Sequence, residues 1–111
     1  MPFKKKITIV TSVRNCIAET KLYLGSLKKY SPTFLDQIVI IDDGSDEETR
    51  EFLESQRDSF DLYRNSKSMG FAFSNNFGAS KATSDWLIFL NNDLVLKKGW
   101  SESYDLLVGG N

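Results

Sequence analysis

The stretch from Trp86 to Asp93 constrains the fold more than any other part of the chain. Five apolar residues, Trp86 to Leu90, are followed at once by Asn91, Asn92 and Asp93. An unbroken apolar run of this length is typical of a strand that is buried on both faces of a sheet. We therefore expect a core strand that ends in two amides and one carboxylate. In open α/β sheets, ligands bind at this carboxyl edge.

Two earlier apolar runs also predict buried strands. Ile7–Val13 is rich in β-branched residues, and Gln37–Ile41 is apolar after its first residue. Apolar side chains at helical spacing predict helices over 19–30, from Ser45 to about Arg57, and over 71–83. Residues 60–63 alternate and predict a third, more exposed strand.

Local signals refine the expected helices. Ser45 and Glu48 form a capping box, which predicts that the second helix begins at Ser45. Phe71, Phe73 and Phe77 are expected in the core rather than in a platform that stacks on a base, and Phe73 and Phe77 fall at helical spacing. The lone Cys16 is expected to be a small buried residue. Gly99 and Trp100 mark the expected start of a last short helix.

Strands that alternate with helices over short connections predict parallel strands with right-handed crossovers, and hence an α/β fold. With the first strand in the centre, the expected spatial order is 3-2-1-4. The chain then reverses direction between strands one and four, which creates a topological switch point. A chain of 111 residues is long enough for one domain with a modest core.

Polar clusters follow strands one, two and four, and this topology brings them to one crevice. The candidate nucleotide-binding residues are Thr11, Val13, Arg14, Asn15, Asp42, Asp43, Asn76 and Asn92. Asp43 suits the imide N–H of a pyrimidine base. Asp93 is the candidate metal ligand, because one carboxylate with phosphate oxygens suits Mg²⁺ or Mn²⁺.

Plainer interpretations stand beside these. Asp42–Ser45 can be only a turn with a helix cap, and Asn91–Asp93 can be a plain turn. Asn76 can be part of a solvated helix face. Neither a G-x-G-x-x-G motif after the first strand nor a P-loop is present, which argues against ordinary NAD and ATP sites.

Composition excludes several functions. The net charge of −1 gives no support for nucleic-acid binding, and the absence of histidine removes histidine acid–base chemistry and histidine metal ligands. A lone Cys16 fits a reducing compartment. No run approaches the roughly 20 apolar residues that a membrane span needs. We therefore expect a cytoplasmic protein, with the inner face of the membrane as an alternative location.

At these residues the chain resembles the amino-terminal half of a family 2 glycosyltransferase with the GT-A fold. The resemblance rests on Ile9–Asn15, Ile38–Ser45, Gly70–Gly78, Trp86–Asp93 and Gly99-Trp100. It implies a three-layer, Rossmann-like GT-A sandwich that binds a nucleoside diphosphate sugar, with Asp43 and Thr11 beside the base. It also implies an acceptor glycan or lipid-linked glycan. The family's DxD metal motif corresponds to Asn91-Asn92-Asp93, where only the last carboxylate is present.

Only 18 residues (111 − 93) follow Asp93. In the family, the second half supplies the acceptor site and the general base. The resemblance therefore implies that residues 1–111 form a single donor-binding domain, truncated relative to the full fold, with no catalytic base assigned. The alternative is a non-catalytic nucleotide-binding or assembly module, for which a homodimer is the simplest assembly.

Overall fold

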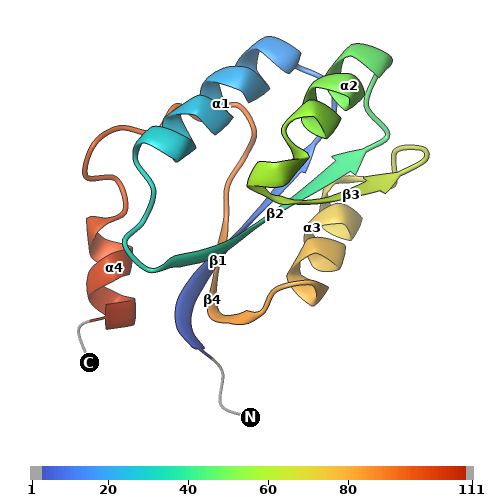
Figure 1. The fold of residues 1–111 in the computed structure, drawn as a ribbon. Helices are drawn as coiled ribbons and strands as arrows, with labels where there is room; N and C mark the ends of the chain where they lie inside the picture. Colours follow the sequence, from blue (N-terminus) through green and yellow to red (C-terminus); the bar gives the residue numbers. More distant parts are fainter. Residues whose placement is uncertain (1–3, 110–111) are drawn as a thin grey trace.

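The computed structural model describes residues 4–109, with side chains from Lys6 onward, and it has the expected α/β fold (Figure 1). All pairings in the four-stranded sheet are parallel, and the order β3-β2-β1-β4 confirms the predicted topology. The strands are β1 (Lys4–Val13), β2 (Leu35–Asp43), β3 (Asp61–Asn65) and β4 (Ser84–Phe89). The helices are α1 (Ile17–Lys29), α2 (Glu47–Ser55), the 3₁₀ turn η1 (Arg57–Ser59), α3 (Phe71–Ser80) and α4 (Glu102–Gly109).

Side chains of the central strands alternate between two apolar layers. One layer joins Ile7, Ile9 and Tyr23 to α4, and a neighbouring cluster joins Val13 to Leu53 of α2. The other layer joins Val10, Val39 and Ile41 of the two central strands to Phe77 of α3. The sheet therefore separates α1, α2 and α4 from α3, which gives three layers (Figure 1).

Helix α3 approaches the sheet through a glycine rather than through a large apolar side chain. A Cβ at Gly78 would lie 2.5 Å from Cγ1 of Val10 and 3.3 Å from Cγ1 of Ile41. The buried residues of α3 are Ser74 and Gly78, while Phe73 is 47% exposed. The prediction that Phe73 lies in the core is therefore wrong, because the close glycine contact turns that side chain outward. The same prediction for Phe71 is also wrong, since this residue begins α3 and is 62% exposed. Phe77 does pack against the core.

The prediction that Trp86–Leu90 is buried on both faces is also wrong. Trp86 is 42% exposed, Leu87 38% and Phe89 49%. β4 is the last strand in the sheet order and pairs with β1 alone among strands of the described region. An apolar run predicts that a segment forms a strand. Whether that strand has a neighbouring strand on both sides depends on the tertiary structure.

Two local predictions also differ from the structure. The N-cap of α2 is Asp46, whose carboxylate accepts a hydrogen bond from the Thr49 N–H at 2.9 Å. Ser45 instead bonds across the molecule to Asn15, so the capping box is not formed. Cys16 is exposed rather than buried, because it stands at the N-cap of α1 with a left-handed backbone.

Candidate functional site

The polar residues that follow β1, β2 and β4 meet in one cleft of about 400 Å³. Its lining comprises Ser12, Arg14, Asp43, Ser68, Gly70, Phe71, Asn91, Asn92 and Asp93. The cleft lies at the carboxyl ends of the strands, beside the switch point between β1 and β4. The predicted convergence of these clusters is therefore confirmed. Arg14, Asp43, Asn92 and Asp93 are the predicted site residues that line the cleft.

Three other predicted residues face away from the cleft because of strand alternation. Thr11 is fully buried, with its hydroxyl 2.6 Å from the Tyr23 hydroxyl of α1. Val13 is fully buried in the cluster with Leu53. Asp42 is 1% exposed and bonds to Arg64 on β3. All three point toward the α1 and α2 face, whereas Ser12 and Asp43 point toward α3.

Asn15 and Asn76 also lie outside the lining of the cleft. Asn15 has a left-handed backbone with φ of 60° and accepts a hydrogen bond from the Asp46 N–H at 2.7 Å. Its own N–H donates to Ser45 Oγ at 2.9 Å. It therefore ties the loop after β1 to the start of α2. Asn76 is exposed on α3.

Asp43 is the most heavily bonded side chain of the cleft. Its Oδ1 accepts from the Met69 N–H at 2.7 Å and from Asn65 Nδ2 at 2.8 Å. Its Oδ2 accepts from Ser68 Oγ at 3.0 Å and from the Gly70 N–H at 3.1 Å. The carboxylate, only 2% exposed, thus organises the loop between β3 and α3. These bonds fix both the wall of the cleft and the start of α3.

The pKa of Asp43 reflects two opposing effects. Burial raises the pKa of Asp43. The hydrogen bonds from Met69, Asn65, Ser68 and Gly70 lower it, and their combined effect is larger, so the pKa lies below its ordinary value. Asp43 is therefore a carboxylate at neutral pH.

Gly44 allows the loop to approach Asp43 closely. Its φ is +67°, and a Cβ there would lie 2.5 Å from the backbone nitrogen of Ser68 and 2.7 Å from the carbonyl carbon of Lys67. Any side chain at this position would push the loop away. The glycine of the Asp-Asp-Gly-Ser stretch is thus part of the architecture of the cleft.

Asp42 supports the opposite side of the same strand end. Its Oδ2 accepts from Arg64 Nη1 at 2.5 Å, and its Oδ1 accepts from the Ser45 N–H at 3.0 Å. Ser45 Oγ in turn donates to the Val13 carbonyl at 3.3 Å. This network joins the ends of β1 and β2 on the face of the sheet opposite to the cleft. Asp42 therefore positions the cleft without lining it.

Asn92 connects the cluster after β4 to helix α1. Its Nδ2 donates to Oγ1 of Thr20 at 3.0 Å, and that hydroxyl donates to the Cys16 carbonyl at 2.8 Å. Thr20 is fully buried. The amide nitrogen of Asn92 is the donor in this bond. Its amide oxygen is the acceptor atom of the side chain.

The residues of the cleft fit a partly hydrated divalent cation. Asp43 and Asp93 are its lining carboxylates, and both oxygens of Asp43 already accept two hydrogen bonds each. Asp93 is exposed and, with the amide oxygens beside it, provides hard oxygen ligands. Within residues 4–109, no group of three acidic, histidine or cysteine side chains forms a complete protein metal site. Any cation would therefore need ligands from water or phosphate.

The amino terminus of α3 adds a site for negative charge. Gly70 is its N-cap and has no side chain to cap the helix, its own N–H donates to Asp43 Oδ2, and both Gly70 and Phe71 line the cleft. Backbone N–H groups and the helix dipole at such an end favour anions. Arg14 lines the same cleft.

Sequence reasoning missed Ser12, Ser68, Gly70 and Phe71 as cleft residues. Ser12 could have been found by extending the alternation of β1 from Val10, since side chains two residues apart share a face. Ser68 could not have been found in this way, because the loop that carries it is placed by its bonds to Asp43.

Several solved structures share the fold of this chain. S. aureus TarS (residues 1–349), whose structure in complex with UDP-GlcNAc is also known, matches with a TM-score of 0.79 at 19% identity, over 95% of this chain and about a third of that one. The mannosyltransferase PcManGT from Pyrobaculum calidifontis, in complex with GDP-Man and Mn²⁺, matches with a TM-score of 0.77 at 13% identity, over 97% of this chain and 34% of that one. These likenesses show a shared fold.

Sequence comparison agrees. The pre-mycofactocin glycosyltransferase of Mycobacterium tuberculosis is 28% identical over 104 residues, which are 92% of this chain and 21% of that protein. The chain thus spans about a fifth of the length of this relative. The model of the family "Glycosyl transferase family 2" matches residues 8–104, and this chain therefore belongs to that family.

Proposed function

We propose that this chain binds the nucleoside diphosphate sugar of a glycosyltransferase that transfers the sugar to an acceptor hydroxyl. The observation that carries the proposal is the meeting of Arg14, Asp43, Asp93 and the amino terminus of α3 in one cleft. The phosphates of such a donor suit the Arg14 guanidinium and the N–H groups of the first turn of α3, and its hydroxyls and base suit hydrogen-bonding oxygens.

Each part of the cleft has a proposed task. The α3 amino terminus and Arg14 face the diphosphate, and Ser12 and Asp43 form the wall nearest the base. Asp43 is 2% exposed and both of its oxygens accept two hydrogen bonds each, from Asn65 and from the loop before α3, so we propose that it shapes the base pocket through this loop. Mg²⁺ or Mn²⁺ at Asp93 would stabilise the charge of the leaving diphosphate.

The chain supplies donor binding, and the rest of the reaction needs groups outside it. In the proposed inverting mechanism, an acceptor hydroxyl attacks the anomeric carbon while a base removes its proton. The family's second half provides that base and the site for an acceptor glycan or lipid-linked glycan. We therefore propose that residues 1–111 bind donor without appreciable transfer. We also propose a cytoplasmic location, since the exposed Cys16 suits a reducing compartment. Across residues 4–109, no helix is long and apolar enough to cross a membrane.

Calorimetry with UDP, dTDP and GDP sugars in the presence of Mn²⁺ tests the proposal. We expect at least one donor to bind, with affinity that falls when Mn²⁺ is removed. Asp93→Ala should abolish the Mn²⁺ dependence, while Asp85→Ala, which removes an exposed carboxylate at the other end of β4, should not. A chain that is folded by circular dichroism and binds none of these donors contradicts the proposal.

A second candidate, a non-catalytic assembly module, is favoured by one observation. Trp86, Leu87 and Phe89 of β4, together with Leu106 and Leu107 of α4, are large apolar side chains that are exposed. Such patches mark interaction surfaces. Light scattering separates the candidates, because a homodimer through this edge should dissociate on Leu107→Lys, whereas a monomer at all concentrations excludes it.

A further inference from the structure

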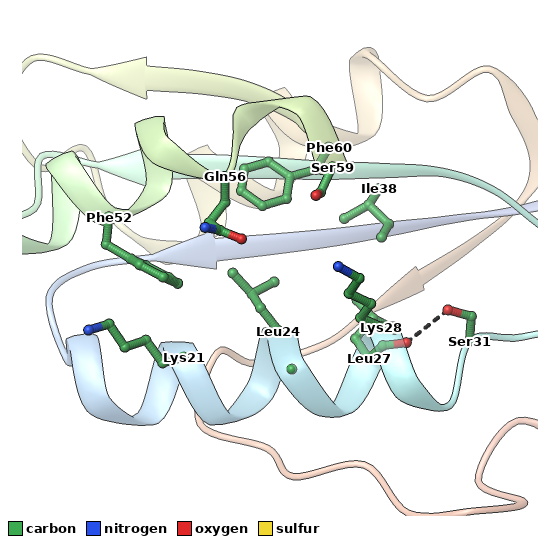
Figure 2. A pocket seen from close by; sticks show the side chains of 11 residues that line it. Lys21, Leu24, Leu27, Lys28, Ser31, Ile38, Phe52, Gln56, Ser59 and Phe60 are labelled. Atoms are coloured by element: carbon green, nitrogen blue, oxygen red, sulfur yellow. Dashed lines mark hydrogen bonds between the residues drawn. The ribbon is translucent and has the colours of Figure 1, made fainter.

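A second cleft lies between α1 and α2, on the sheet face opposite to Asp43 and α3 (Figure 2). Its volume is about 440 Å³, which is in the range of small-molecule sites. Apolar side chains form its floor and walls, and they are Leu24, Leu27, Ile38, Phe52 and Phe60. The proposed donor site uses none of these residues.

Gly25 lines this cleft in the middle of α1 and has no evident role within the chain itself. A Cβ added there would meet no atom within 4 Å, and its backbone is not left-handed. Glycine in a helix interior stabilises the helix less than alanine would, by about 1 kcal/mol. Nothing in the described part of the chain supplies a packing reason. A ligand that lies across α1 at this point does, because a larger side chain would occupy its space.

The rim of the cleft is positively charged. Lys21 and Lys28 both line it from α1, and no acidic side chain does so among residues 4–109. Lys21 Nζ lies 5.2 Å from the centre of the Phe52 ring, which holds this charge at the mouth. Figure 2 shows Lys21 and Phe52 at one end, Lys28 at the other, and Leu24 between them. Polar groups of Gln56 and Ser59 complete the edge.

We propose that this cleft binds a single-chain amphiphile with an anionic head group. The alkyl chain lies along Leu24, Phe52 and Phe60 and crosses α1 at Gly25, and the head group pairs with Lys21 or Lys28. The cleft suits such a molecule better than a protein partner, because its volume of about 440 Å³ is that of a small-molecule site. This site is separate from the proposed donor site and does not depend on it.

The first test measures binding of monomeric decyl phosphate, below its micelle concentration, by calorimetry. We expect saturable binding, and binding of decyltrimethylammonium, which has the same chain and the opposite charge, about tenfold weaker or less. Equal binding of the two amphiphiles overturns the proposal. So does binding to anionic phospholipid vesicles without any binding of the monomer, since that result assigns the surface to a membrane.

The second test uses two matched pairs of variants. Gly25→Leu fills the cleft and should weaken decyl phosphate binding about tenfold, while Ser103→Leu, on the exposed face of α4, should not change it. The double variant Lys21→Glu and Lys28→Glu should also weaken binding, whereas Lys29→Glu, on the same helix but outside the lining, should not. Unchanged affinity in the first variant of each pair overturns the proposal. The charge variants remain informative if Gly25→Leu does not fold.

Discussion

Oγ1 of Thr20 accepts a 3.0 Å hydrogen bond from Nδ2 of Asn92, which joins the first half of α1 to the polar cluster after β4. The two residues are 72 positions apart in the chain. Thr20 is fully buried, so water cannot replace this bond. This hydrogen bond therefore fixes the position of Asn92 and of the adjacent Asp93. The effect of the bond on the proposed cation site can be measured.

Thr20→Val should lower the affinity for Mn²⁺ with nucleotide about tenfold. Valine keeps the shape of threonine but leaves Asn92 without its acceptor, which should also reduce the free energy of unfolding by about 1–2 kcal/mol. Thr20→Ser keeps the hydroxyl and should restore binding. Calorimetry and urea unfolding measure the two effects. If Thr20→Val loses stability but binds nucleotide as well as wild type, Thr20 has a structural role alone. This prediction rests on the proposed function.

Asp43→Asn should reduce the free energy of unfolding by about 2–3 kcal/mol, because an amide group would face donors that now point at a carboxylate. Since the pKa of Asp43 is lower in the folded chain, its stabilising effect is present above the unfolded pKa of about 3.9 and is lost as pH falls through the folded value. Asp43→Asn should therefore lose less stability on acidification than wild type does.

Urea unfolding at several pH values between neutrality and strong acid measures this difference. Asp58→Asn, which changes an exposed carboxylate in η1, serves as the control and should follow wild type. Parallel pH profiles for Asp43→Asn and wild type would contradict the assignment of Asp43 as the centre of the loop.

Two glycines in helices should respond to alanine in opposite directions. Gly78→Ala places a Cβ against Val10 at 2.5 Å and should destabilise the chain by about 1–3 kcal/mol. Gly25→Ala meets no atom and should stabilise it by about 0.5–1 kcal/mol through helix propensity. Thermal or urea unfolding of both variants decides this. A stabilised Gly78→Ala would show that α3 does not pack against the sheet at this distance.

Tyr23 should make the chain sensitive to alkali. Burial raises its pKa to about 12, although the Thr11 hydroxyl lowers it in part. The neutral form is therefore favoured by folding. The chain should therefore lose about 2–3 kcal/mol of its free energy of unfolding as pH rises from the ordinary pKa near 10 toward 12, and none of this loss occurs below pH 10. Tyr23→Phe should be less stable than wild type at neutral pH but should lose less stability between pH 10 and 12, as followed by urea unfolding.

The sequence predicted the sheet and its edge because hydrophobic periodicity and chain order are local properties. Apolar runs at Ile7–Val13 and Gln37–Ile41 identified the strands, and alternation with helices fixed a parallel order. The same reasoning brought Asp43 and Asp93 to one cleft. It did not show that the side chains of Thr11 and Val13 point away from the cleft, since proximity to a strand end does not tell which face a side chain occupies. Counting alternation from Val10 would have selected Ser12.

Only the tertiary structure decided the remaining features, because they depend on contacts between distant segments. The exposure of Trp86 follows from the position of β4 at the end of the sheet order. Ser45 bonds to Asn15 instead of capping α2, since the end of β1 lies beside it. The loop around Asp43 and the bond between Thr20 and Asn92 likewise join residues that no local pattern relates. The sequence by itself determined where the cleft lies, and long-range packing determined which side chains line it.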